Sequence, residues 1–283
     1  MNSSTVELRA DRLRLALRPD VGGAIAGLWH GDTPVLRSLE PAALTTARAS
    51  GCFPLVPYSN RVGHCRFRWQ GQDHPLAANF KDSPHALHGV AWQRPWAVVS
   101  RRAAQATLQY RHAPDADWPF AFDVSQRLEL TPAGLTAHLA ITNRDDRAQP
   151  VGLGWHPNFP KRAQARLDIE VNQRWDSDAG KLPTQAVAQE GIHSVVADLD
   201  LDHCFGGWQG PALIRDDVLA LRLTSSLPYL VVYTPPTLPF FAVEPASHVN
   251  NAIQMADPAA HGLRTLAPGA TFEAWMQLEI TEL

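Results

Sequence analysis

The chain has little cysteine, and the spacing of its cysteines matches no disulfide or metal-binding pattern. Its 283 residues include three cysteines, Cys52, Cys65 and Cys204, and no Cys-x-x-Cys pair. An odd number of scattered cysteines argues against a disulfide framework and against a cysteine-ligated zinc site. We therefore expect a reducing compartment and a fold that a hydrophobic core stabilises.

Strong net charge and long apolar runs are also missing. The formal charge is −3 at pH 7 with both signs scattered, so electrostatics gives no reason to expect a nucleic-acid partner. Residues 1–9 contain no apolar run suited to a signal sequence, and no later stretch reaches the length of a membrane span. We expect a cytoplasmic monomer or homodimer that binds neither nucleic acid nor membrane.

Several common catalytic motifs are absent as well. The sequence has no glycine-rich phosphate loop, no Gly-x-Ser-x-Gly, no His-Glu-x-x-His and no His-x-His. These absences count against P-loop nucleotide binding, that class of serine hydrolase, and zincin-like or cupin-like metal sites. We predict no cofactor and no metal ion.

What the sequence does contain is alternation of apolar and polar residues with a period of two, which is typical of β-strands. Residues 6–17 alternate apolar and charged side chains with one slip near Ala10, and residues 128–143 have the pattern of a hairpin with a Thr-Pro-Ala-Gly turn. Only residues 41–50 have a weak helical composition. The further strands that we expect are residues 107–112, 167–171, 219–223, 229–233, 240–243 and 272–280.

Many short strands, punctuated by 23 prolines, leave little room for long helices. This organisation favours an antiparallel sandwich or barrel. An immunoglobulin-type sandwich needs only about 100 residues, so this one must be larger. We predict a single all-β domain over residues 1–283.

Two ionisable residues stand beside rigid or apolar neighbours. His156 follows Gly154 and precedes Pro157, which indicates a fixed imidazole; the alternative is a buried structural histidine. Glu244 follows the apolar run 240–243, where partial desolvation would raise its pKa and make it a better base; the alternative is an exposed strand end. Histidine and glutamate together can exchange protons near neutral pH.

Three more residues are candidates for binding. His88 lies in a loop before Gly89, and a surface turn is its alternative interpretation. Arg61 presents a forked donor, and Asp202 could accept a hydrogen bond from a substrate hydroxyl. Either of the last two could equally be half of a structural ion pair.

Taken together, these motifs resemble the aldose 1-epimerase (mutarotase) family, whose fold is the galactose mutarotase-like β super-sandwich. The resemblance runs over nearly the whole chain. The matching segments are Asn-Arg at 60–61, His-Gly at 88–89, Trp-His-Pro-Asn-Phe at 155–159, Asp-His-Cys-Phe at 202–205 and Glu-Pro-Ala-Ser-His at 244–248.

The resemblance implies a small-molecule sugar substrate and a role for each candidate. Glu244 would be the general base and His156 the general acid, while His88, Arg61 and Asp202 would bind the sugar hydroxyls. The two proton transfers would open and reclose the sugar ring, which interconverts the α and β anomers without a cofactor.

Departures from the family pattern concern the sugar rather than the reaction. Val90 stands where galactose-type members have a second glycine, and Trp92 stands where a hexose-6-phosphate branch has arginine. A free or modified sugar, such as an acid or a sulfonate, is therefore expected. A phosphosugar epimerase, a non-catalytic sugar-binding protein and a glycosidase or lyase of similar architecture remain alternatives.

Overall fold

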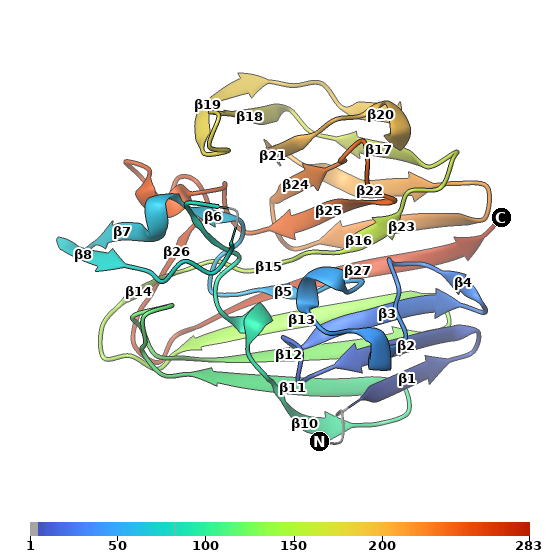
Figure 1. Ribbon diagram of the computed structural model, residues 1–283, viewed down its shortest axis with the longest axis horizontal. Coiled ribbons are helices and arrows are strands. Elements are labelled where there is room, and N and C mark those ends of the chain that lie inside the picture. The colour runs from blue at the N-terminus through green and yellow to red at the C-terminus, as the bar shows by residue number, and fades with distance from the viewer. Residues whose placement is uncertain (1–4, 82) are drawn as a thin grey trace.

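The structure, a computed structural model, describes residues 5–81 and 83–283, and it is built almost entirely from β-strands (Figure 1). Residues 1–4, which belong to the predicted 1–283 domain and to the N-terminal segment without a signal pattern, lie outside the described residues. The long strands pair antiparallel. The predicted all-β fold class is confirmed.

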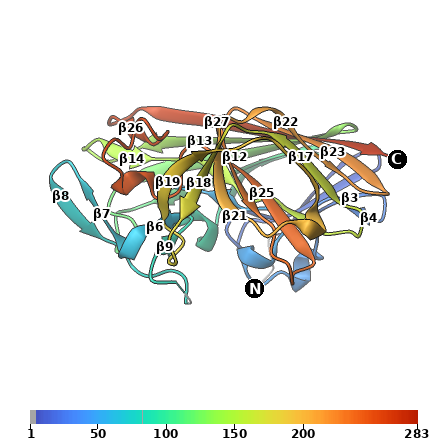
Figure 2. The same ribbon diagram turned by 90° about the horizontal axis from the view of Figure 1, so that it is seen from above.

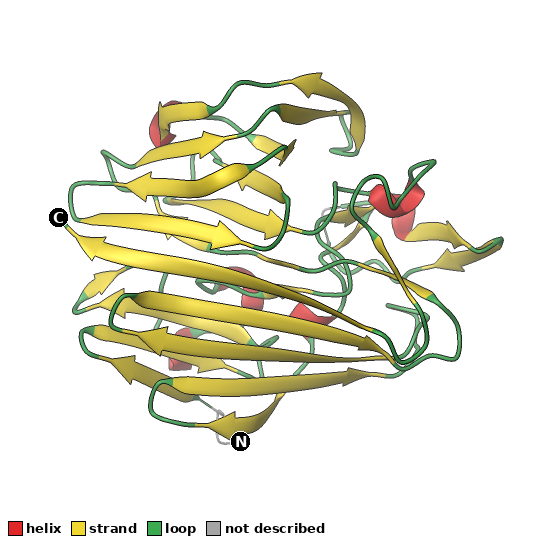
Figure 3. Ribbon diagram, turned by 180° about the vertical axis from the view of Figure 1, so that it is seen from behind, coloured by secondary structure: helices red, strands yellow, loops and turns green. Residues whose placement is uncertain are grey.

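The largest sheet has nine strands and faces the viewer in Figure 3. Its long central strands come from distant parts of the sequence. In spatial order the strands are β10 (Ala97–Arg101), β11 (Gln105–His112), β12 (Phe122–Thr131), β13 (Gly134–Asn143), β27 (Thr271–Glu282), β23 (Leu219–Ser225), β22 (Gln209–Arg215), β17 (Arg166–Glu170) and β20 (Ile192–Val195).

A second layer packs against this sheet, as the view from above shows (Figure 2). One part of this layer is an eight-stranded sheet with β19 (Pro183–Ala188), β18 (Gln173–Ser177), β21 (Asp202–Gly206), β24 (Tyr229–Tyr233), β25 (Phe240–Ala246), β15 (Gly154–Trp155) and β5 (Pro54–Leu55), and with β16 (Asn158–Pro160) also paired to β25. The other part has β1 (Val6–Ala10), β2 (Leu13–Arg18), β3 (Ala24–His30) and β4 (Thr33–Pro34).

Short elements complete the described chain. The two-stranded pairs are β14 (Gln149–Val151) with β26 (Arg264–Leu266), β6 (Arg61–Val62) with β9 (Ala86–Leu87), and β7 (Arg66–Trp69) with β8 (Gln72–Pro75). The 3-10 turns are η1 (Pro41–Ala43), η2 (Ala47–Ala49), η3 (Gly63–Cys65), η4 (Ala91–Gln93), η5 (Val196–Asp198) and η6 (Ala252–Gln254). None of the helices in the described ranges has the length and apolarity that crossing a bilayer requires.

The β12–β13 hairpin shows how alternation builds the core. Along both strands, inward-facing residues are buried and their neighbours are partly exposed, as a half-buried antiparallel sheet requires. The inward side chains join a core that includes Trp118, Trp155 and Phe241. The hairpin predicted at residues 128–143 is confirmed, as are strands at the six other predicted ranges.

Two sequence-based expectations need correction. Residues 6–17 are not one strand with a slip but the hairpin β1–β2, because Asp11 takes a left-handed conformation (φ 50°) that turns the chain. Residues 41–50 form no α-helix and contain only η1 and η2, since no apolar stripe stabilises a longer helix.

Candidate functional site

The register of the eight-stranded sheet brings the two principal candidates together. Strand β25 pairs Ala246 with Gly154 of β15 and Ala242 with Asn158 of β16. Counting inward from both pairs places His156 opposite Glu244, in the gap between β15 and β16. Directly opposite residues of an antiparallel pair point to the same face. Register alone therefore makes these side chains neighbours.

The shared face of this pair lies away from the nine-stranded sheet. Trp155 is fully buried and donates from its indole N–H to Oε1 of Gln126 on β12, 3.3 Å away. His156 follows it in the chain and therefore points the other way. Glu244 was expected at the end of a strand, but β25 continues to Ala246, so the carboxylate lies inside the strand and is only 2% exposed.

The two side chains are in direct contact. Nε2 of His156 lies 3.3 Å from Oε1 of Glu244. Nδ1 of His156 and Oε2 of Glu244 are buried and have no hydrogen-bond partner among the described residues. The imidazole also stacks on Phe53, with ring centroids 4.6 Å apart. Unsatisfied buried polar atoms are costly, and here both belong to residues that line a cavity, which is typical of a ligand site.

Burial shifts the pKa values of both groups in opposite directions. Desolvation raises the pKa of Glu244 well above its ordinary value, and nearby Asp202 adds to the rise while Arg61 opposes it. Desolvation lowers the pKa of His156 to about 4, and the charges of Arg48 and Arg37 act in the same direction. The carboxylate is thereby a stronger base and the imidazolium a stronger acid than either is in water.

A left-handed backbone conformation holds His88 beside this pair. His88 and Gly89 both have positive φ (61° and 68°), and a Cβ on Gly89 would lie 2.1 Å from the carbonyl oxygen of Val56. The N–H of Asn60 donates to Nδ1 of His88, so the neutral ring carries its proton on Nε2. Burial, with the charge of His156, lowers the pKa of His88 well below its ordinary value. His88 is buried, which excludes the surface-turn alternative.

Arg61 and Asp202 form an ion pair at the rim. Nη2 of Arg61 lies 3.7 Å from Oδ2 of Asp202, and Nζ of Lys181 lies 3.6 Å from the same oxygen. Nη1 of Arg61 also donates to Oδ1 of Asn60, 3.0 Å away. The structural-pair alternative thus describes a contact that does exist, but this contact lies at the edge of the cavity rather than in the core.

All five candidates line one cavity of about 490 Å³. This volume is within the range of small-molecule sites. Sequence reasoning missed several lining residues, among them Arg48, Phe53, Phe80, Lys181 and Tyr233. None of them stands in a motif that indicates binding, although Tyr233 ends a predicted strand, so only the fold reveals that they line the cavity. Across the described ranges, no cluster of three or more His, Cys, Asp or Glu side chains is arranged to hold a metal ion.

The other histidine of the 244–248 motif has a structural position. Nδ1 of His248 bonds to the carbonyl oxygen of Val249, and Nε2 accepts from the N–H of Ser59. Ser247 binds the backbone N–H of Leu153 through its hydroxyl. This end of β25 therefore fixes the segments that carry His88 and His156.

A family model described as aldose 1-epimerase matches residues 4–279 of the chain. The chain belongs to the aldose 1-epimerase family. Among curated relatives, the uncharacterized protein YphB of Escherichia coli (strain K12) is 31% identical in an alignment that covers 92% of this chain and 93% of YphB. A second uncharacterized E. coli protein, YihR, is 26% identical over 82% of this chain and 80% of its own length.

Solved structures agree with this family fold. A putative aldose 1-epimerase from E. coli K12 superposes with a TM-score of 0.88 at 29% identity and covers 99% of both chains. A galactose mutarotase-like protein from Clostridium acetobutylicum has a TM-score of 0.86 at 19% identity, over 99% of this chain and 95% of its own. The predicted super-sandwich of the galactose mutarotase-like type is thereby confirmed.

Proposed function

We propose that the protein is an aldose 1-epimerase that interconverts the α and β anomers of a free or modified sugar. The observation that carries this proposal is the direct contact of His156 and Glu244, whose second polar atoms lack partners among the described residues, in the lining of a sugar-sized cavity. Family membership supports the reaction class.

In this proposal Glu244 takes the proton from the anomeric hydroxyl while Nε2 of His156 gives a proton to the ring oxygen. The C1–O5 bond breaks, and C1 becomes a free aldehyde. Rotation about the C1–C2 bond presents the other face of the carbonyl group. Ring closure reverses both transfers, so the pair ends with the proton arrangement with which it began.

The electrostatics of the site suit this exchange. In the reacting form the pair holds one proton, on His156, and after ring opening it again holds one, on Glu244, which is the arrangement that the shifted pKa values favour. Burial makes His156 readier to release the proton and Glu244 readier to accept it. Each positioned transfer contributes roughly 10²–10⁴-fold to the rate, and a fixed ring orientation adds to this.

The remaining candidates bind the sugar in this account. His88 donates from Nε2 to a sugar hydroxyl, since its Nδ1 is occupied by Asn60. Arg61 and Asp202 offer donors and an acceptor from the lining of the same cavity. We also propose that the chain acts as one domain, because residues from 48 to 244 line the same cavity. The three free cysteines support a cytoplasmic location.

Saturation-transfer NMR of anomer exchange tests the proposal. A panel of glucose, galactose, xylose, arabinose, glucuronate and glucose 6-phosphate is measured with the wild-type protein and with Glu244→Gln. Accelerated exchange of any sugar in the wild type, lost in the variant, supports the proposal. A folded protein that binds a sugar but never accelerates exchange is instead a binding protein, and hydrolysis of nitrophenyl glycosides would indicate a glycosidase.

A further inference from the structure

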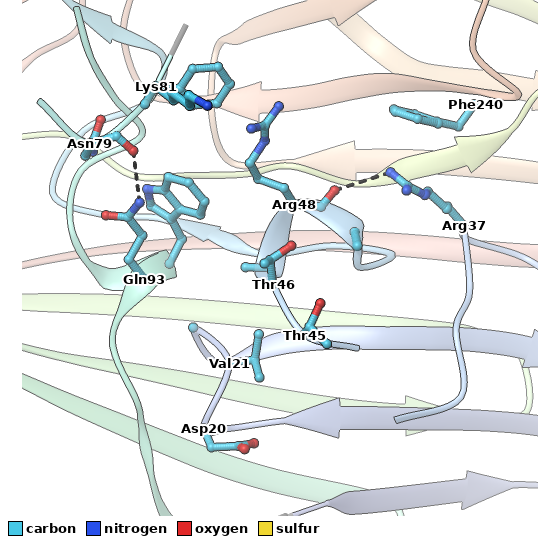
Figure 4. A pocket seen from close by; sticks show the side chains of 15 residues that line it. Asp20, Val21, Arg37, Thr45, Thr46, Arg48, Asn79, Lys81, Gln93 and Phe240 are labelled. Carbon is cyan, nitrogen blue, oxygen red and sulfur yellow. Dashed lines mark hydrogen bonds between the residues drawn. The ribbon is translucent and has the colours of Figure 1, made fainter. Parts of the chain in front are cut away.

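A second hollow adjoins the candidate site. It has a volume of about 710 Å³ and lies over η2 and the segment around residues 79–81 (Figure 4). Arg48, Phe80 and Phe240 line both this hollow and the cavity that holds His156 and Glu244. A ligand seated on the catalytic pair can therefore extend a substituent into the second hollow without leaving the protein surface.

Three cationic side chains line this second hollow. Arg37, Arg48 and Lys81 line it, and none of the three has a carboxylate within ion-pair distance in the part of the chain that the structure describes. Most other arginines of the described chain do have such a partner, for example Arg14 and Arg162. Three cations around one hollow, without an acidic partner among the described residues, provide a site for an anion.

Aromatic rings fix the two guanidinium groups. Arg48 lies over the ring of Phe80, 4.0 Å from its centroid, and Arg37 lies over Phe240 at 4.3 Å. Arg37 also donates from Nη1 to the backbone carbonyl oxygen of Arg48, 3.2 Å away. Stacking engages the faces of these planar groups and leaves N–H edges for a ligand. Burial also lowers the pKa of Arg37, which marks a partly desolvated cation.

One acidic residue lines the same hollow. Asp20 accepts two hydrogen bonds from Arg18, both 2.8 Å long, so its charge is balanced locally. In Figure 4 Asp20 lies at the opposite side of the view from Lys81. The cationic side is therefore the one shared with the catalytic cavity, through Arg48.

Different charged residues act on the two members of the catalytic pair. Arg48 and Arg37 act on the pKa of His156, whereas Asp202 and Arg61 act on that of Glu244. In the proposed reaction His156 serves the ring oxygen and Glu244 the anomeric hydroxyl. In a pyranose, C5 is bonded to the ring oxygen, so a substituent on C5 lies on the His156 side.

We propose that the substrate is an anionic sugar whose carboxylate, sulfonate or phosphate is carried on C6, and that Arg48, with Arg37 and Lys81, binds this group. The inference rests on the proposed function for the placement of the ring, but the anion site itself rests on the cations and the hollow. Arg48 is the principal ligand because it alone of the three lines both spaces.

Calorimetric titration tests the site independently of catalysis. The probes are glucuronate, glucose 6-phosphate and the 6-sulfonate of glucose, compared with the neutral sugars glucose and xylose. The variants are Arg48→Gln and Arg48→Lys. Arg102→Gln is the matched control, because it removes one positive charge from the exposed turn between β10 and β11.

We expect at least one anionic probe to bind about 10- to 100-fold more tightly than glucose, as a charge-assisted pair provides. Arg48→Gln should remove this preference, so that anionic and neutral sugars bind alike, Arg48→Lys should keep part of it, and Arg102→Gln should keep all of it. The three anions identify which group the site prefers.

Equal binding of anionic and neutral sugars, an undiminished preference in Arg48→Gln, or no binding of any anionic probe would overturn the anion site. Anomer exchange is measured on the same samples. Arg48-dependent binding without accelerated exchange would preserve the anion site and reject the proposed epimerase, so the two failures are distinguishable.

Discussion

Nε2 of His156 lies 3.3 Å from Oε1 of Glu244. The pairing of β25 with the strands on either side of His156 brings the two residues together, and no flexible loop is needed to do so. Glu244 lies on β25, His156 lies between β15 and β16, which both pair with β25, and Phe53 stacks on the imidazole. A site built on paired strands is preorganised. The reacting groups need no closure step to meet.

Removing the donor of His88 should weaken sugar binding more than turnover. His88→Asn keeps a residue that tolerates the φ of 61° but loses the Nε2–H donor. We expect KM to rise about 3- to 10-fold, the value of one hydrogen bond, with kcat within about twofold. Exchange rates measured against sugar concentration separate the two constants, and an unchanged KM would contradict this role.

Gly89 should be intolerant of any side chain. Gly89→Ala adds a Cβ that would lie 2.1 Å from the carbonyl oxygen of Val56, at a φ of 68°. Because backbone must move to relieve this clash, we expect a loss of at least about 2 kcal/mol in the free energy of unfolding. Urea denaturation measures this loss.

Gly71→Ala is the matched control for that measurement. Gly71 also has a positive φ of 83°, but among the described residues no atom beyond its chain neighbours lies within 4 Å of the position that a Cβ would take. Only the conformational penalty remains, about 1–2 kcal/mol. A loss for Gly89→Ala no greater than that for Gly71→Ala would show that the tight approach to Val56 is not required.

Stability should fall as the solution is acidified below pH 6.5. Burial lowers the pKa of His156 and His248 to about 4 in the folded state, whereas the unfolded chain titrates near 6.5. Between these values the unfolded state binds more protons, so each histidine costs up to about 1.4 kcal/mol of stability per pH unit as pH falls. Urea denaturation from pH 7 to pH 4.5 measures the slope, and a flat profile would contradict the assignment.

The contribution of Glu244 to stability depends on pH with the opposite sign. Its folded pKa is raised, so its contribution to stability is present below about pH 4.5 and is lost as pH rises through the folded value. Glu244→Gln should therefore be more stable than the wild type at pH 8, and this difference should vanish near pH 4.5. A variant less stable than the wild type at pH 8 would show that the carboxylate is stabilised rather than strained by its surroundings.

Much of the fold follows from local patterns in the sequence. Strict alternation reveals β12 and β13, and β24 coincides with the predicted range 229–233. Two-residue strands such as β5 and β15 are too short for a period to be visible. The β1–β2 turn was missed because it requires a left-handed Asp11, which no periodicity indicates.

The site was predictable as a set of residues but not as a geometry. Gly, Pro and apolar neighbours distinguish His156 and Glu244, while their contact depends on the register of strands far apart in the chain. Arg48 carries no local signal, because its role depends on a hollow formed by distant segments. Nonlocal pairing therefore limits what the sequence reveals.

The most direct test of the account compares anomer exchange in four proteins: wild type, Glu244→Gln, His156→Ala and the double variant. We predict that each single variant stays folded and loses about 10²–10⁴-fold in catalysed rate. The double variant should lose little more, because the two residues act as one unit. Wild-type exchange rates in either folded single variant would contradict paired acid–base catalysis by Glu244 and His156.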